Sequence, residues 1–281
     1  MKSSNVEEES IQEDGDSASI VPEVLPPKTK APYEDFESID FQEGVAVEDP
    51  INMQTWLLYA SVGIAMGFVA FGVDLAVGEL FRLKWGTTQD MLLNGGTTEA
   101  WLIYLGISVL FGGAASAMTV YYGPGAAGSG IAELMGYFNG IKVPGFISVE
   151  SLVTKVVGNV LAVSAGLAVG KEGPLAHIGA IVGQGMLYLP VKGYEQFQNE
   201  SSKREASAAG AAAGVSAAFG APIGGTLLAY EASRPNTFWS FSLMWKVFFC
   251  SCISTYTLNV LTSAFDGESL TFLNAGLIQF G

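Results

Sequence analysis

Three long apolar stretches limit what this chain can fold into more than any other feature of its sequence. Residues 56–78, 101–122 and 238–265 are mostly apolar, and each is long enough to cross the ~30 Å hydrocarbon core of a bilayer as a helix. The chain is 49% hydrophobic and only 14% charged, which is typical of polytopic membrane proteins. The sequence therefore predicts an all-α polytopic membrane protein. Lysines and arginines are too few and too scattered to predict its orientation.

The apolar segments between these stretches are short and interrupted. Residues 131–138 are bounded by glycines and are too short to cross a bilayer, and a helix predicted over 146–170 breaks at Gly170 before a short run at 174–189. A polar loop is expected over 86–98. Backbone left unpaired in lipid costs several kcal/mol, so such breaks persist only where protein covers them or where they line a polar cavity. The breaks are therefore the first places to look for a site.

Small residues dominate 203–219, where Gly210 and Gly214 form a Gly-x-x-x-Gly pattern. Such a face lets two helices approach closely in a membrane. Pro222 then begins a further helix toward Glu231. We interpret this cluster as helix packing rather than as a ligand site.

The acidic character of the chain is concentrated in its first 50 residues. The net charge is −14, and 14 of the 27 acidic residues but only three of the 13 basic ones lie in residues 1–50. Runs of one sign, together with several prolines, predict a disordered acidic cytosolic tail, with partner binding as an alternative. The tail lacks the apolar core of a secretory signal. Residues 51–281 are predicted to form a transmembrane domain, and no pattern indicates nucleic-acid binding.

The cysteines and the histidine do not predict a metal or redox site. Cys250 and Cys252 lie two residues apart in an apolar helix, which suits neither a disulfide nor a metal, so we predict that they are packing residues. His177 is the only histidine. We expect it to be buried with its hydrogen bonds satisfied, and pH sensing is the alternative. No cofactor and no metal are expected.

The first break is Gly128-Ser129-Gly130-Ile131. Its glycines permit tight turns, the serine offers a hydroxyl donor, and the amides of Gly130 and Ile131 precede a short helix. Helix amino termini attract anions, so this motif is a candidate anion site. The alternative is an ordinary serine N-cap, and the motif alone does not decide between the two.

The second break is Gly170-Lys171-Glu172-Gly173-Pro174, in which Pro174 suits the first turn of a helix. A carboxylate at this helix start can occupy an anion site itself and leave it on protonation, so Glu172 is predicted to act as gate and proton carrier. An ionisable residue within an apolar stretch is functional by default. The alternative is a structural pair between Glu172 and Lys171.

A nucleotide-binding phosphate loop is excluded at the same segment. That motif requires a leading glycine and a hydroxyl residue after the lysine. Here Ala165 and Glu172 occupy those two positions. An ATP-hydrolysing enzyme is therefore not expected.

Three ordered motifs, at 128–131, 170–174 and 211–225, resemble those of the CLC chloride channels and proton-coupled exchangers. The resemblance covers residues 51–281, and the segment 238–259 is most similar to the intracellular branch of endosomal and lysosomal membranes. It implies the first of two inverted repeats of the CLC fold, with broken, tilted and re-entrant helices. An endosomal, lysosomal or vacuolar membrane with a cytosolic amino terminus is the implied location.

The resemblance also implies the site and its partners. Chloride is the expected ion, with protons as a second, and Glu172 corresponds to the gating glutamate. Serine at position 129 goes with chloride in this family, whereas proline goes with nitrate. Helices over 223–230 and 238–265 are expected to contact a second copy or another CLC subunit, among membrane lipid. The implied anion-binding residues are Gly128, Ser129, Gly130, Ile131, Gly170, Lys171 and Gly173.

Three departures from the family pattern qualify these expectations. Ala132 stands where proline is usual at the start of the short helix, and the inner proton glutamate is replaced in the pair Glu231-Ala232. Alanine cannot carry a proton, so passive or loosely coupled chloride movement is an alternative to exchange. The second half of the fold and the cytosolic nucleotide-sensing (CBS) domains are not in this sequence. A truncated, non-conducting subunit that associates with full-length CLC proteins is therefore the alternative function.

Overall fold

The computed structural model describes residues 53–190, 194–233 and 239–265. The predicted tail and the last residues of the chain lie outside these ranges. The described part is helical and contains no strand. Its α-helices are α1 (Met53–Leu93), α2 (Thr97–Tyr121), α3 (Ile131–Phe138), α4 (Val149–Ala165), α5 (Glu172–Met186), α6 (Glu200–Phe219), α7 (Pro222–Ser233) and α8 (Phe241–Phe265), with short 3-10 helices η2 (Pro124–Ala126) and η3 (Glu195–Phe197).

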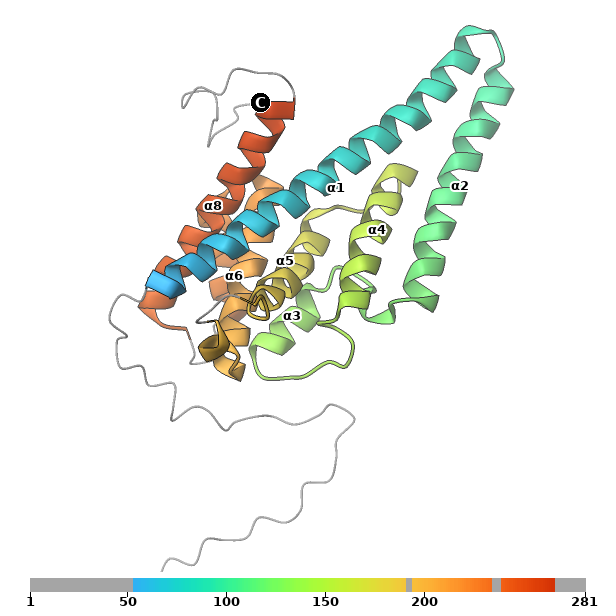
Figure 1. Ribbon diagram of the computed structural model, residues 1–281. Coiled ribbons are helices and arrows are strands. Elements are labelled where there is room, and N and C mark those ends of the chain that lie inside the picture. Colours follow the sequence, from blue (N-terminus) through green and yellow to red (C-terminus); the bar gives the residue numbers. More distant parts are fainter. Residues whose placement is uncertain (1–52, 191–193, 234–238, 266–281) are drawn as a thin grey trace, which may run out of the picture.

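Three of the described helices, α1, α2 and α8, are long and apolar enough to cross a membrane. They correspond to the three stretches predicted from sequence. α1 and α2 form an antiparallel hairpin whose tip projects beyond the other helices, and α8 lies across the first half of α1 (Figure 1). Large apolar side chains are exposed along them, which fits contact with lipid. Examples are Phe68, Leu102, Leu105, Val109, Leu110 and Trp245.

The predicted polar loop over 86–98 is wrong for most of its length, because α1 continues to Leu93. The hydroxyls of Thr87 and Thr88 donate to helix carbonyls of Leu83 and Lys84, so these polar residues fit within the helix. The chain turns only at Asn94–Gly96, where Gly95 has φ +87°. α1 therefore reaches much farther than its apolar stretch alone predicts.

A buried lysine fixes the far part of α1 to α4. The Lys84 ammonium donates to the carbonyl of Ala165 at 2.7 Å and lies 4.0 Å from the centroid of the Tyr104 ring. The last carbonyls of a helix carry partial negative charge, so a cation there is favourable. Lys84 thus caps α4 from a different helix, although its side chain is completely buried.

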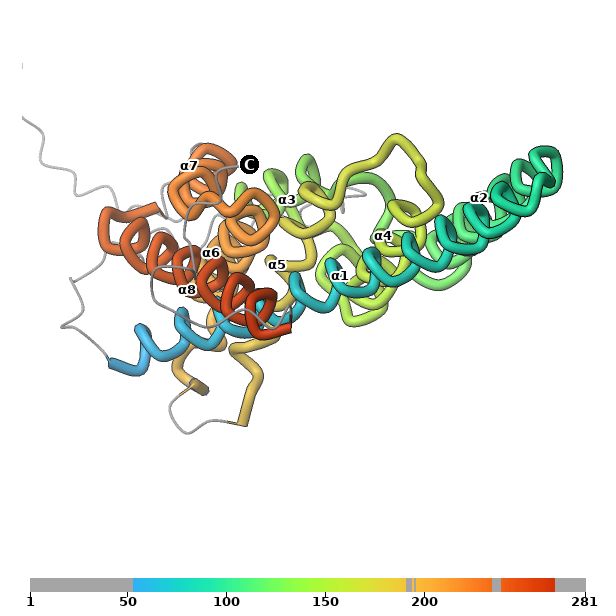
Figure 2. Tube along the Cα trace, turned by 90° about the horizontal axis from the view of Figure 1, so that it is seen from above, coloured from blue at the N-terminus to red at the C-terminus, as the bar shows by residue number. Residues whose placement is uncertain are grey.

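The centre of the molecule is the crossing of α5 and α6, which lies between α7 and α8 on one side and α2 and α4 on the other (Figure 2). Gly179 and Gly210 each pack against the other's backbone, and Gly214 packs against the backbone of Leu175. A Cβ at any of these positions would overlap main-chain atoms. The predicted packing role of the small residues in 203–219 is confirmed.

The predicted limits of α4 and α5 are wrong by several residues. α4 ends at Ala165 instead of Gly170, because Gly166 adopts a left-handed φ of +82° and terminates the helix. α5 begins at Glu172, two residues before Pro174. The break is therefore the whole segment 166–171 rather than a point at Gly170.

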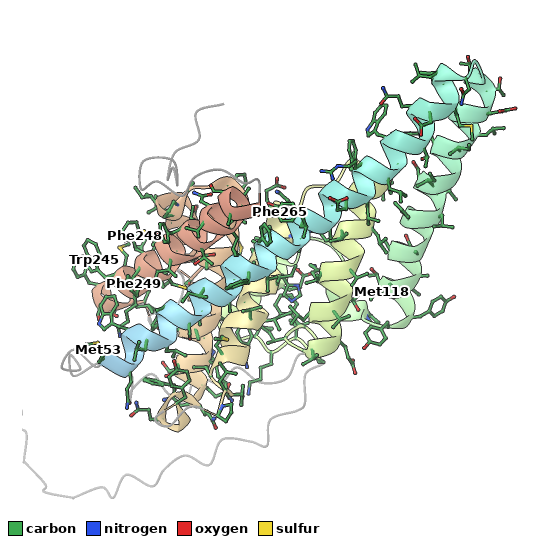
Figure 3. All side chains as sticks on the ribbon, turned by 45° about the horizontal axis from the view of Figure 1, so that its top comes forward. Met53, Met118, Trp245, Phe248, Phe249 and Phe265 are labelled. Carbon is green, nitrogen blue, oxygen red and sulfur yellow. The ribbon has the colours of Figure 1, made fainter. Side chains whose placement is uncertain are left out.

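Aromatic side chains gather along the first half of α8 (Figure 3). Phe249 stacks edge-on against Trp56 of α1 with ring centroids 5.1 Å apart, whereas Trp245 contacts Phe248 and is exposed. Cys250, on the inner side of α8, is buried beside Ala209 of α6. The prediction that Cys250 is a packing residue is confirmed.

Candidate functional site

The first break forms a tight turn that ends in the helix α3. Gly128 and Gly130 have φ values of +66° and +84°, which disfavour residues with a Cβ. Gly130 is the N-cap of α3, and the Ile131 amide donates to the Ser129 hydroxyl at a long 3.4 Å. The alternative of an ordinary serine N-cap is therefore wrong, because the N-cap is Gly130 and Ser129, one residue earlier, makes only this long bond to the helix. The serine is exposed and is not committed to a close partner.

A lysine that the sequence did not single out supports this turn from α4. The Lys155 ammonium donates to the carbonyls of Ala126 at 3.0 Å and Gly128 at 2.8 Å. Its side chain is almost completely buried. Lys155 thus binds the carbonyl side of the turn. A lysine within an apolar helix was the available signal for this role.

The second break ends at α5, whose first residue is Glu172. The Glu172 carboxylate folds back over Gly170 and occupies the space that a Cβ of Gly170 would need. The structural alternative, a pair between Lys171 and Glu172, is wrong. The Lys171 ammonium lies 2.6 Å from an Asp74 carboxylate oxygen on α1. Among the described residues, no hydrogen bond or ion pair restrains the Glu172 carboxylate.

The two breaks meet at Gly173 and Ser129. A Cβ on Gly173 would lie 2.9 Å from the Ser129 Cβ and 3.6 Å from the Ile131 Cδ1. The amino termini of α3 and α5 are therefore in direct contact, and only glycine at 173 allows this approach. Each helix start contributes about half a positive charge, so two of them together form a strong anion-attracting point.

A cavity of about 620 Å³ opens beside this junction. Its wall includes Gly128 and Ser129 from the first break and Gly170 and Pro174 from the second. α2 and α4 complete it with residues that include Thr119, Lys155 and Asn159. Within the described residues, no group of three His, Cys, Asp or Glu side chains could hold a metal ion.

His177 lies one turn beyond Gly173 and is completely buried. Its Nε2 lies 2.9 Å from the Phe146 carbonyl, and its ring stacks on the Phe146 ring at 3.8 Å. Nδ1 has no hydrogen-bond partner among the described residues. The expectation of a buried histidine is confirmed, but only one of its two nitrogens is satisfied.

The pair Glu231-Ala232 faces two different environments at the end of α7. Glu231 is exposed, whereas Ala232 is buried in an apolar cluster with Leu134 and Phe138 of α3. The position that the resemblance assigns to the inner proton glutamate therefore points into the protein and holds a methyl group. Glu231 points elsewhere, as expected for its neighbour on a helix.

This chain is similar in sequence to a chloride exchanger and a chloride channel protein of other organisms. H(+)/Cl(-) exchange transporter 7 of Bos taurus is 35% identical over 305 aligned residues, which cover 100% of this chain and 38% of that protein. Chloride channel protein D of Dictyostelium discoideum is 40% identical over 232 residues, or 80% of this chain and 22% of that protein. This chain thus spans well under half the length of these relatives.

Solved structures of the same kind share the fold. A slow cyanobacterial Cl-/H+ antiporter superposes with a TM-score of 0.67 at 25% identity, covering 75% of this chain and 48% of that one. A eukaryotic CLC transporter gives a TM-score of 0.64 at 23% identity, covering 75% of this chain and 38% of the other. The sequence profile for voltage gated chloride channels matches residues 97–277. The chain belongs to the voltage gated chloride channel family, also called the CLC family.

Proposed function

We propose that this chain forms part of a chloride pathway across a membrane, with the ion bound where α3 and α5 begin. The observation that carries the proposal is the contact between Gly173 and Ser129, which joins two helix amino termini at one point. The Ser129 hydroxyl and the amides of Gly130 and Ile131 supply donors from one side. Gly170, Lys171 and Gly173 supply backbone from the other.

Chloride suits such a site because it is held by hydrogen-bond donors and dipoles without a fixed coordination geometry. An anion at one helix amino terminus gains roughly 0.3–1 kcal/mol when exposed and up to ~2 kcal/mol when partly buried. Two termini give a moderate affinity, which allows an ion to enter and also to leave. Lys155 strengthens the site electrostatically from α4, since its ammonium sits behind Gly128.

Glu172 is proposed to gate this site. Its carboxylate is itself an anion at the α5 amino terminus, so it competes with chloride for the same amides. Protonation removes its charge and lets chloride take its place. The side chain has no hydrogen bond or ion pair to break among the described residues, which leaves it free to move.

The residue at position 232 favours chloride movement without strict proton exchange. The exchangers among this chain's relatives are named for both ions, but here the inner proton position is the buried Ala232. We further propose a dimer, or association with other CLC subunits, in an endosomal, lysosomal or vacuolar membrane with a cytosolic amino terminus. These partners and this location rest on the family resemblance.

Reconstituted chloride flux tests the proposal. Liposomes that contain the protein should release chloride, and Glu172→Ala should make the flux insensitive to pH or abolish it. Glu79→Ala is a matched control, because Glu79 is an exposed carboxylate on the α1 hairpin whose ion pair within the described part of the chain is with Arg82. A Glu79 variant that loses the pH response as Glu172→Ala does would overturn the gating role.

The same assay separates the alternative of a non-conducting subunit. That alternative predicts no chloride flux from this protein alone and flux only when a full-length relative is present. Flux from the protein alone, with a normal response in the Glu79→Ala control, rejects it.

A further inference from the structure

His177 contacts the first break from the same face of α5 that carries Gly173 of the second break. Gly173 and His177 are four residues apart, so they lie on the same side of the helix. Gly173 contacts Ser129, and the Cβ that Gly130 lacks would lie 2.8 Å from His177 Nδ1 and 3.0 Å from its Cβ and Cγ. Ser129 and Gly130, which we call the anion loop together with Gly128 and Ile131, thus contact Gly173 and His177 on consecutive turns of α5.

The imidazole ring is fixed on its other sides. Phe146, just before α4, stacks on it at 3.8 Å with an interplanar angle of 10°, and the Phe146 carbonyl accepts from Nε2–H at 2.9 Å. Phe146 is itself buried. The bond to the carbonyl requires the proton on Nε2, so the unpaired Nδ1 faces Gly130 as a lone pair.

We propose that His177 is a positioning residue that sets the distance between the α3 and α5 amino termini, and thereby the affinity and selectivity of the anion site. The ring is a rigid spacer between Phe146 and Gly130. Because Gly130 has no side chain, its backbone rests directly on the imidazole, and the amides of Gly130 and Ile131 take their position from it. The inference rests on the proposed chloride site.

An ordinary core histidine would not require this arrangement. Such a residue contributes packing and one hydrogen bond, and another side chain of similar volume would replace it at a cost in stability alone. If His177 is a spacer beneath the anion loop, its replacement should affect anion binding as well as stability. Changing His177 should move the amides relative to Gly173, and the change should appear in anion binding even when the protein stays folded.

The experiment measures chloride binding by calorimetry, and the chloride-to-nitrate flux ratio, in three variants. His177→Gln places an amide N–H near Nε2 and preserves the bond to Phe146, so chloride affinity should stay within about threefold of wild type. His177→Leu keeps bulk but loses the bond and the flat ring, and should weaken chloride binding by about tenfold and lower the chloride preference. His177→Asn cannot reach the Phe146 carbonyl and should resemble His177→Leu.

Ile178→Val is the matched control. Ile178 is the next residue of α5, is equally buried and belongs to a different core cluster from Phe146, the partner of His177. It should change thermal stability without changing the flux ratio. If His177→Leu does not fold, the comparison of the Gln and Asn variants gives the same test.

Two results would overturn the inference. One is unchanged chloride affinity and selectivity in both His177→Asn and His177→Leu when these variants lose only thermal stability. The other is an equal shift of the flux ratio in Ile178→Val. A wild-type protein that neither binds nor moves chloride would instead reject the proposed function, and the inference with it.

Discussion

The Ser129 side chain, in the loop before α3, packs directly against the backbone of Gly173 of α5, because a Cβ on Gly173 would lie 2.9 Å from the Ser129 Cβ. A real Cβ atom does not approach another non-bonded carbon that closely. Two motifs that are well separated in the sequence therefore become one structural unit, and the charge of two helix termini is concentrated there.

Gly173→Ala should separate these termini. The added methyl would displace Ser129, and since small misplacements at a site cost much binding, chloride affinity should fall by about ten- to a hundredfold. Calorimetric titration of chloride measures the change. Gly185→Ala is the control in the same helix, because nothing lies within 4 Å of its Cβ position. Equal losses in both variants would contradict the role of the contact.

Gly170→Ala should free the gate without removing it. The new methyl takes the space that the Glu172 carboxylate now occupies, and a flexible side chain can move away at little cost in stability. We expect flux to become less sensitive to pH, toward the behaviour of Glu172→Ala, with an unchanged melting temperature. A pH profile of chloride flux identical to that of wild type would count against this resting position of the carboxylate.

Asp74→Asn should release Lys171. The pair lies at 2.6 Å with both side chains about one-third exposed, so its loss should cost less than about 1 kcal/mol of stability. The freed ammonium is then a net positive charge beside the α5 amino terminus, and chloride should bind more tightly at low ionic strength. The gain should shrink as an inert salt is added, because mobile ions screen it. A gain independent of salt would point to another cause.

Lys155→Met should weaken both the fold and the site. It leaves the buried carbonyl of Ala126 and the partly buried carbonyl of Gly128 without this donor, and an unpaired buried group costs about 1–3 kcal/mol. Thermal unfolding in detergent at fixed chloride measures the loss. Lys142→Met, which removes a more exposed lysine from a loose 3.8 Å pair with Glu200, should change stability by less than about 1 kcal/mol.

Ala232→Glu should introduce proton movement. Position 232 faces the protein interior beside α3, so a carboxylate there would sit where the resemblance expects the proton acceptor. Proton uptake driven by a chloride gradient should rise above that of wild type, at a cost of several kcal/mol in stability for the buried group. Glu231→Gln, on the exposed neighbour, should leave proton uptake unchanged. Chloride flux without added proton movement in Ala232→Glu would speak against the predicted position.

The long apolar helices and the positions of the two glycine-rich breaks could be predicted from the sequence, because each depends on local properties of the chain. Apolar length identified α1, α2 and α8, and the positive φ values of Gly128 and Gly130 follow from a pattern that only glycine tolerates. The roles of individual site residues in anion binding stay predictions. Their grouping around Gly173 is what the structure adds.

The partners that support the site could not be predicted, since they come from distant parts of the chain. Lys155 binds carbonyls of the loop before α3, and Lys171 pairs with Asp74 of α1. Nothing in a local pattern specifies which carbonyl or carboxylate a lysine will meet. The error in the length of α1 has a different origin, because the Thr87 and Thr88 hydroxyls donate to carbonyls of their own helix.

The backbone contact between α5 and α6 also limits how the pathway can open. With Gly179 against Gly210 and Leu175 against Gly214, a twist of α5 about its own axis would drive main-chain atoms into each other. The gating proposed for Glu172 would therefore be a swing of one carboxylate on a stationary helix, and any larger movement would have to carry α5 and α6 as a single rigid body.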